Sequence, residues 1–274
     1  MYRYDLGQRP TDQRTTMNRT TAFTATALLA LSMTACSSTQ STETESGIAL
    51  VNQNTLTVCT NPPFEPFEYK TDAGEIVGID MDIMAEVATD LDLELSIVEA
   101  AFDAMESGAS LESNQCDIIA TGMTITEERE ERFSFSNPYY DANQGVLVTA
   151  GTTVASLEDL NGQSVAVQIE TTGASLAEEQ GLNATVFEDL GLVVQAVATG
   201  QTDAAIADVG TLAPYVTDEL TIGYIEQTDE QYGFGVKKTN PELVTAVNNT
   251  LTRITESGRL EAIVEAHTGA ESAE

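Results

Sequence analysis

The sequence is poor in basic side chains and has almost no histidine. It carries 11 Lys and Arg against 44 Asp and Glu, a formal net charge of −33. Nucleic acids require a basic footprint, so none is expected as a partner. The single histidine, His267, lies near the C-terminus, which disfavours a Ser-His-Asp or Cys-His catalytic apparatus. With no His and Cys cluster of zinc-site spacing and no phosphate-cradling glycine loop, we expect neither metal nor cofactor.

Long hydrophobic runs are also lacking. The apolar run at residues 22–33 follows Arg14 and Arg19 and is shorter than the roughly 20 residues that cross a bilayer. Small residues come next and then Cys36, which is the layout of a secretory signal. We therefore predict a signal peptide at residues 1–35. The cysteine resembles that of a bacterial lipoprotein box, which implies a lipid on Cys36; the alternative is a cleaved signal with an unmodified Cys36.

Two further expectations concern the segment after the signal and the remaining cysteines. Residues 36–54 are rich in Ser, Thr, Glu, Gln and Asn, so they are predicted to form a flexible, lipid-anchored tether. Cys59 and Cys116 are candidates for a disulfide if the chain is exported. The alternative is a pair of buried free thiols.

The rest of the chain alternates strand-like and helix-like segments. Ile83, Met84 and Val87 recur at helical spacing, and Asp80 or Asp82 suits the start of that helix. Strands are predicted at residues 56–58, 93–98, 117–120, 164–167 and 203–207, and helices at 80–91, 101–111, 171–180, 190–199 and from Asn240 onward. This alternation predicts two α/β units, connected by strand-like links at residues 145–149 and 233–236.

Ligands of open α/β sheets bind at the carboxyl ends of the strands, and polar or aromatic side chains follow several predicted strands. They are Asn61, Phe64, Thr121, Gly122, Thr124, Arg129, Glu170, Thr171, Thr172, Gly173 and Asp208. This set suits an α-amino acid, because an arginine and hydroxyls can bind its carboxylate and an acidic side chain can accept from its ammonium.

Each of these residues also has a purely structural interpretation. Arg129 could be a surface residue paired with Glu127 or Glu130. Asp208, Thr171 and Thr172 could simply begin helices. Phe64 and Phe102 could be ordinary core residues.

Long motifs in the first half of the chain resemble those of a known family. Residues 59–69 (CTNPPFEPFEY), 74–82 (GEIVGIDMD), 116–129 (CDIIATGMTITEER) and 133–140 (FSFSNPYY) resemble the amino-acid solute-binding proteins of ABC importers, bacterial extracellular solute-binding protein family 3. The resemblance implies a two-lobed α/β fold of the type II periplasmic-binding-protein kind, with two mostly parallel sheets flanked by helices and a two-strand hinge. Lobe 1 would comprise residues 55–141 and 232–268, lobe 2 residues 142–231, and a tail residues 269–274.

The resemblance also implies roles for individual residues. Arg129 would bind the ligand α-carboxylate with Thr124, Thr172 and amides near Thr171. Asp208 would take the α-amine together with the carbonyl of Gly122. Phe64 and Phe102 would sandwich the ligand side chain, whose end would face Asn61 and Thr121. Asn61 stands where binders of cationic side chains often have aspartate, which favours a polar uncharged or acidic ligand. Glu170 replaces a usual glycine.

The implied function is capture of an amino acid outside the cell and its delivery to an ABC permease. The chain would work as a monomer, without catalysis, on the outer face of the cytoplasmic membrane. One alternative is an exported enzyme similar to cyclohexadienyl dehydratase, for which Glu170 or Glu65 is the suggested acid or base. Another is a ligand sensor on the same fold.

Overall fold

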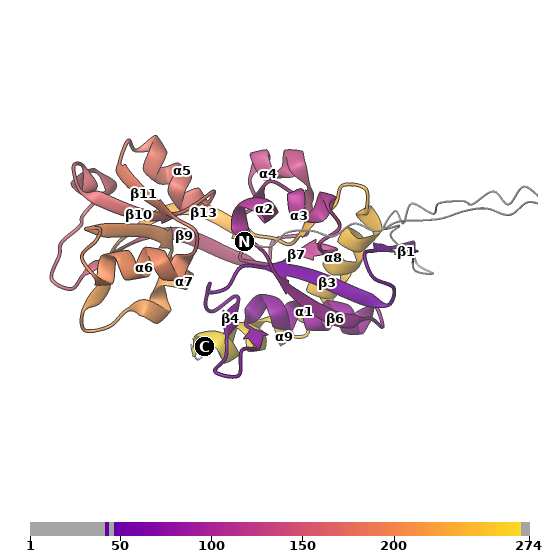
Figure 1. The fold of residues 1–274 in the computed structure, drawn as a ribbon. Helices are drawn as coiled ribbons and strands as arrows, with labels where there is room; N and C mark the ends of the chain where they lie inside the picture. Colours follow the sequence, from indigo (N-terminus) through magenta and orange to yellow (C-terminus); the bar gives the residue numbers. More distant parts are fainter. Residues whose placement is uncertain (1–41, 44–46, 270–274) are drawn as a thin grey trace, which may run out of the picture. The chain divides into compact units, whose positions relative to one another are not determined.

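The computed structural model describes residues 42–43 and 47–269. These residues belong to one compact unit that contains two five-stranded sheets with helices packed on them (Figure 1). The predicted signal peptide, Cys36 and nearly all of the predicted tail lie outside the described residues.

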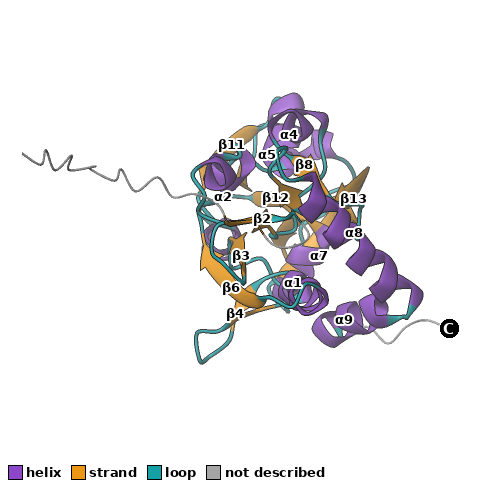
Figure 2. Cartoon of the chain, turned by 90° about the vertical axis from the view of Figure 1, so that its right-hand side faces the viewer, coloured by secondary structure: helices purple, strands orange, loops and turns teal. Residues whose placement is uncertain are grey.

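The first sheet has the strand order β6-β3-β7-β14-β8. Its strands are β3 (Thr55–Thr60), β6 (Glu94–Glu99), β7 (Ile118–Ile119), β8 (Ser134–Phe135) and β14 (Gly235–Val236). Its helices are α1 (Ile79–Asp90), α2 (Phe102–Glu106), α3 (Ala109–Glu112), α4 (Glu127–Arg132), α8 (Pro241–Glu256) and α9 (Arg259–Thr268). The two C-terminal helices pack beside α1 (Figure 2).

The second sheet has the order β11-β10-β12-β9-β13. Its strands are β9 (Tyr140–Thr149), β10 (Ser164–Gln168), β11 (Asn183–Phe187), β12 (Ala204–Asp208) and β13 (Leu220–Tyr232). Its helices are α5 (Thr172–Glu179), α6 (Leu190–Ala198) and α7 (Val209–Leu212), with 3₁₀ turns at Leu157–Leu160 and Ala213–Tyr215. Two short pairs complete the described strands: β1 (Thr42–Glu43) with β2 (Ala49–Leu50), and β4 (Tyr69–Lys70) with β5 (Ile76–Val77).

Both sheets are mixed, and in each of them four of the five strands run in one direction, as the prediction of mostly parallel sheets requires. In the first, β3 pairs in parallel with β6 and β7, while β14 is antiparallel to β7 and β8. In the second, β10 is parallel to β11 and β12, while β9 is antiparallel to β12 and β13. Helical crossovers join the parallel strands, as such pairs require, whereas β9 and β13, which are antiparallel to each other, connect the two sheets.

The strands β9 and β13 form the two-stranded connection (Figure 1). Near one end, Tyr140 pairs with Tyr232, and Thr124 of the first half forms an isolated bridge with Tyr232. The predicted links are therefore misplaced. Residues 145–149 lie inside the second sheet, and residues 235–236 lie inside the first. Their apolar strand pattern reflects burial within a sheet rather than a crossing between sheets.

The predicted tether is too long at its C-terminal end. Ile48 and Leu50 are buried, and Val51 donates its backbone N–H to the carboxylate of Asp117 at 2.6 Å. Asn240 donates to the carbonyl of Ala49 at 2.8 Å. Two apolar side chains separated by one residue are enough to dock this segment as a short strand, which the polar composition of the surrounding sequence obscures.

Two helix predictions also need correction. Asp80 does not cap α1: Gly78 occupies the N-cap position, and the Asp80 carboxylate is buried, accepting from the Gly122 N–H at 2.9 Å and from the hydroxyl of Tyr139 at 2.5 Å. The single helix predicted over 101–111 is two, α2 and α3, because Gly108 adopts a left-handed φ of 76° between them. Glycine takes this conformation without a Cβ clash.

Cys59 and Cys116 form a disulfide with Cα atoms 5.6 Å apart. Both belong to a buried cluster that also contains Phe102, Met105 and Phe133. The disulfide therefore fixes β3 to the segment that leads into β7, within the core beside α2. Among the described residues, no helix has the length and hydrophobicity needed to cross a bilayer.

Candidate functional site

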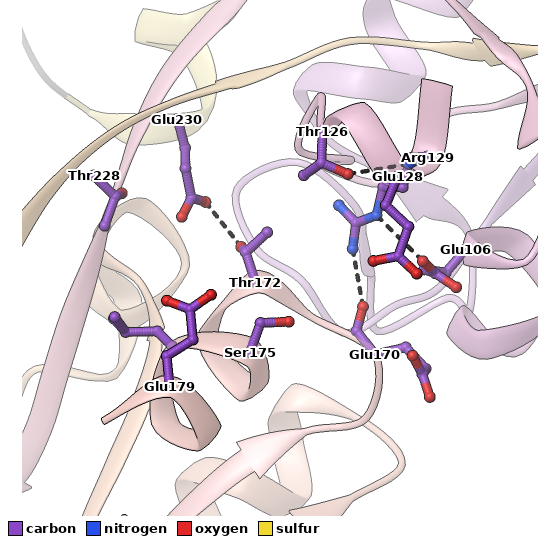
Figure 3. Close-up of a pocket in the computed structure, with 11 residues that line it drawn as sticks. Glu106, Thr126, Glu128, Arg129, Glu170, Thr172, Ser175, Glu179, Thr228 and Glu230 are labelled. Carbon is purple, nitrogen blue, oxygen red and sulfur yellow. Dashed lines mark hydrogen bonds and ion pairs between the residues drawn. The ribbon is translucent and has the colours of Figure 1, made fainter. Parts of the chain in front are cut away.

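A cavity of about 340 Å³ lies between α2 and α4 of the first half and α5 and β13 of the second (Figure 3). Its polar lining combines one arginine with several carboxylates and hydroxyls. The lining residues are Glu106, Thr126, Glu128, Arg129, Glu170, Thr172, Ser175, Leu176, Glu179, Thr228 and Glu230. Of the predicted ligand-binding set, Arg129 and Thr172 line this cavity directly.

Arg129 lies on α4, whose start is fixed by the Thr126 hydroxyl accepting from the Arg129 N–H at 3.2 Å. The side chain is only 4% exposed, so the surface-pair interpretation of this residue is wrong. Its Nη1 donates to the Thr124 carbonyl at 2.8 Å and its Nη2 to the Glu170 carbonyl at 2.9 Å. The guanidinium lies over the ring of Phe102 at 5.7 Å, where a cation–π attraction is favourable.

Burial lowers the pKa of Arg129, and the carboxylates of Glu106, Asp208 and Glu230 oppose that shift. Glu106 is also buried and pairs with Arg132 on the next turn of α4. An arginine stays charged in a protein, so the site holds a desolvated cation among acidic groups. Such a cation binds an incoming carboxylate strongly.

Hydrogen bonds link polar side chains on both sides of the cavity. The Thr172 hydroxyl donates to Glu230 Oε2 at 2.8 Å, and the Thr124 hydroxyl donates to the same oxygen at 3.2 Å. Gln144 Nε2 lies 3.1 Å from that oxygen and 2.9 Å from Asp208 Oδ1. Thr124 belongs to the half of the protein built on the first sheet, and Thr172 begins α5 in the half built on the second. Glu230 therefore links the two halves by hydrogen bonds.

Asp208 ends β12 and is 7% exposed. Its side chain makes no cap hydrogen bond to α7, which leaves its carboxylate directed to Gln144. Burial raises the pKa of Asp208 to about 7, with a further increase from Glu230, while a hydrogen bond with Tyr232 and the charge of Arg129 lower it. A carboxyl group with this pKa gains a strong preference for the ionised form when a cation, such as a ligand ammonium, arrives beside it.

Glu170 precedes α5 and has a left-handed φ of 56°. This conformation is uncommon for any residue other than glycine, and glycine is the residue that the resemblance described above implies at this position. The backbone carbonyl of Glu170 accepts from Arg129, while its side chain points away from the guanidinium (Figure 3). The unusual backbone therefore holds a contact between the two halves of the protein.

Several predicted residues lie deeper or have internal partners. Asn61 donates to the Ala100 carbonyl at 2.8 Å and accepts from Gln168 at 3.0 Å. Thr121 donates to Glu68. Thr171 caps α5, accepting from the Ala174 N–H at 3.2 Å and donating to the Gln168 carbonyl at 2.8 Å. The direct ligand contacts expected of Asn61, Thr121 and Thr171 remain predictions.

Phe64 lies against Gly122, whereas Phe102 belongs to the buried cluster around the disulfide. Phe64 and Phe102 are both 7% exposed. Gly122 has a φ of 52°, and a Cβ at this position would lie 2.5 Å from Cε1 of Phe64. Glycine is therefore required for the Phe64 ring to lie against this turn. The stacking of a ligand between the two rings remains a prediction.

Two buried carboxyl groups lie behind the Thr121–Gly122 turn. Glu68 and Asp80 are both fully buried, and each contacts the turn, through Thr121 and the Gly122 N–H respectively. Burial raises the pKa of Asp80 to about 7 and that of Glu68 well above its ordinary value, the latter with a contribution from Asp80. Their hydrogen bonds position the turn from inside the first half.

Sequence reasoning missed Glu230, Gln144 and Glu179. Gln144 lies in the middle of β9, directly before the apolar run at residues 145–148, and is only 1% exposed. Glu230 and Glu179 are two of 44 acidic residues and only the fold shows that they line the cavity. Within the described part of the chain, no cluster of His, Cys, Asp and Glu is arranged to hold a metal ion.

Comparison with known proteins gives consistent results. The model of the bacterial extracellular solute-binding proteins, family 3, matches residues 56–270. The arginine-binding extracellular protein ArtP of Bacillus subtilis is 28% identical over 225 residues, which cover 76% of this chain and 84% of ArtP. The L-cystine-binding protein TcyJ of Escherichia coli is 27% identical over 226 residues, or 80% of this chain and 84% of TcyJ.

Among solved structures, a mutant of ArgBP from T. maritima superimposes with a TM-score of 0.75 at 34% identity, covering 79% of this chain and 96% of ArgBP. The chain belongs to the bacterial extracellular solute-binding proteins, family 3. The family resemblance and the two-lobed α/β fold predicted from the sequence are thereby confirmed.

Proposed function

We propose that this chain is the binding component of an ABC importer for a cationic amino acid, with L-arginine as the leading candidate. The observation that carries the proposal is the cavity lining, in which Arg129 is accompanied by five glutamates among the eleven lining residues of the described chain. The ligand α-carboxylate would bind Arg129, and its ammonium would bind Asp208.

The charges of the cavity favour a second positive charge on the ligand. Glu106 and Glu128 pair with Arg132, and Glu230 accepts from the threonines. Glu179, about two helical turns beyond Thr172 on α5, directs its carboxylate into the cavity (Figure 3). We propose that Glu179 attracts the cationic end of the ligand, where charge-assisted hydrogen bonds are strong.

This proposal differs from the ligand class expected from Asn61. That expectation took the missing aspartate as a sign of an uncharged or acidic ligand. In the structure the Asn61 amide is occupied by Ala100 and Gln168, so it has little influence on ligand charge. An acidic ligand side chain would instead enter a cavity rich in carboxylates, which repel it.

The remaining parts of the proposal concern location and mechanism. Family membership supports an exported protein, and the sequence around Cys36 supports lipid attachment at the outer face of the cytoplasmic membrane. Contacts from both halves to one ligand would favour a closed state, which the permease would recognise. Because the family is one of solute-binding proteins, we propose a binding function, which requires no chemical step, rather than the dehydratase-like or sensor alternatives.

The experiment is a thermal-shift screen of the chain from residue 37 against the common amino acids. A ligand that binds only the folded state raises the melting temperature by mass action. We expect L-arginine, L-lysine or L-histidine to give the largest increase, and L-glutamate none. An increase with L-glutamate or L-aspartate alone would contradict the cationic ligand, and no increase with any amino acid would contradict the function.

A further inference from the structure

Glu230 reaches the cavity from an irregular part of β13. The pairing of β13 with β9 shifts register between Glu226 and Glu230. Within this irregularity Asp229 has a left-handed φ of 51°, and the N–H groups of Thr228 and Asp229 lie 2.9 and 3.3 Å from Oδ1 of Asn143. A bulge of this kind redirects a side chain, and here it fixes the backbone that places Glu230 in the cavity lining.

The carboxylate of Glu230 has the contacts expected of a bound carboxylate ligand. Its Oε2 accepts from Thr172 at 2.8 Å, from Gln144 at 3.1 Å and from Thr124 at 3.2 Å. These three donors come from α5, β9 and the loop before α4. Arg129 lines the same cavity, and the charge of Glu230 is one of those that raise the pKa of Arg129.

The donors have limited capacity. A threonine hydroxyl has one proton, so it donates to a single acceptor at a time. Thr124 and Thr172 each donate that one hydrogen bond to Glu230. A ligand carboxylate beside Arg129 therefore gains these two hydrogen bonds only when Glu230 gives them up.

We propose that Glu230 is an internal competitor: it occupies the carboxylate-binding donors, holds the two halves together through them, and is displaced when a ligand α-carboxylate binds. The proposal rests on the proposed function, because it takes the ligand to be an amino acid. Withdrawal of Glu230 also removes a charge that raises the pKa of Asp208, so displacement favours the ionised Asp208 that an ammonium needs.

The competition affects every amino acid equally, because all share the α-carboxylate. Glu230→Ala is therefore expected to tighten the binding of L-arginine and of its neutral analogue L-citrulline to a similar extent, about tenfold, as two recovered hydrogen bonds to a charged group allow. Glu230→Gln keeps the shape and an acceptor oxygen but loses the charge, and should give a smaller gain. If Glu230→Ala folds poorly, Glu230→Gln provides the same affinity test.

The matched control is Asp229→Asn. It removes the same charge one residue away, from an exposed side chain outside the cavity lining, and asparagine tolerates the left-handed conformation. We expect its affinities to equal those of the wild type. An equal gain in Asp229→Asn would attribute the effect to net charge and overturn the proposal.

A second measurement uses acetate, a carboxylate without an amine. In Glu230→Ala the vacated donors should bind acetate, so acetate should raise the melting temperature of this variant relative to chloride at equal ionic strength, and do so more than in wild type. This readout does not depend on amino-acid binding, so it separates failure of the competitor from failure of the proposed function. Weaker or unchanged amino-acid binding in Glu230→Ala, or no selective effect of acetate, would overturn the competitor.

Discussion

Arg129 donates from Nη2 to the backbone carbonyl of Glu170 at 2.9 Å, joining α4 of the first half to the turn before α5 of the second. The contact uses a main-chain acceptor, so the identity of residue 170 does not determine it directly. The buried guanidinium thus contacts both halves, through the carbonyls of Thr124 and Glu170. The charge and geometry of Arg129 therefore underlie every prediction of ligand binding.

Replacing Arg129 by alanine should abolish amino-acid binding. The variant loses a desolvated, charge-assisted contact, and we expect at least about a hundredfold weaker binding, which corresponds to roughly 3 kcal/mol. Arg129→Lys should also bind weakly, because an ammonium cannot reproduce the guanidinium fork. Isothermal titration calorimetry measures both, with circular dichroism to show that the variants remain folded. Wild-type affinity in either variant would remove Arg129 from the site.

Asp208 should make binding dependent on pH. Its pKa of about 7 means that a growing fraction is protonated as the pH falls below 7, and that fraction cannot pair with an ammonium. Affinity should be constant above pH 7 for as long as the ligand ammonium stays charged, and fall by up to about tenfold per pH unit below pH 7. Near pH 7 binding should release protons, measurable by calorimetry in buffers with different ionisation enthalpies.

The control for this dependence is Asp208→Asn. We expect weaker binding at pH 8 and loss of the decline near pH 7, since asparagine does not titrate. If the variant kept the same decline, another group would be responsible for it.

Glu170→Gly should stabilise the protein. A residue with a Cβ is strained at a left-handed φ of 56°, and glycine relieves that strain. Because glycine also adds entropy to the unfolded chain, we expect a net gain of up to about 1 kcal/mol in the free energy of unfolding. Glu170→Ala removes the same charge but keeps the strain, so urea unfolding should rank it below Glu170→Gly. Equal stability of the two would exclude strain at this position.

The disulfide should contribute to stability without being needed for the site. Cys59 and Cys116 enclose a loop with a sequence separation of 57, and cross-links of this kind typically contribute about 2–4 kcal/mol. The double variant Cys59→Ala/Cys116→Ala should therefore unfold at lower urea concentration while keeping its affinity for amino acids. An unchanged unfolding midpoint would indicate that the bond does not constrain the unfolded chain.

The fold was largely predictable because its signals are local. The apolar spacing of Ile83, Met84 and Val87 defines α1, and short apolar runs define β7, β10 and β12. The exposed edge strand β11 and the long strand β13 gave no such signal, because most of their side chains are not buried. The docking of Ile48 and Leu50 depends on neighbours nearly 200 residues away.

The candidate site was predictable only in part. Arg129 and Thr172 were identified through the family motifs and line the cavity. Glu230 and Glu179 were not, because pairing register and helix phase decide which of many acidic residues face inward. Asn61 was expected to face the end of the ligand side chain, which remains a prediction; it is not among the residues that line the cavity. Its hydrogen bonds to Ala100 and Gln168 could be known only from the packed structure.

The central claim is that the cavity binds an amino acid with a cationic side chain. The most direct test is calorimetric titration of L-arginine and L-citrulline, which have similar size but differ in the charge of the terminal group. The account predicts that L-arginine binds at least about tenfold more tightly, and that Glu179→Gln narrows this ratio. Equal affinity for the two ligands, or tighter binding of L-citrulline, would contradict it.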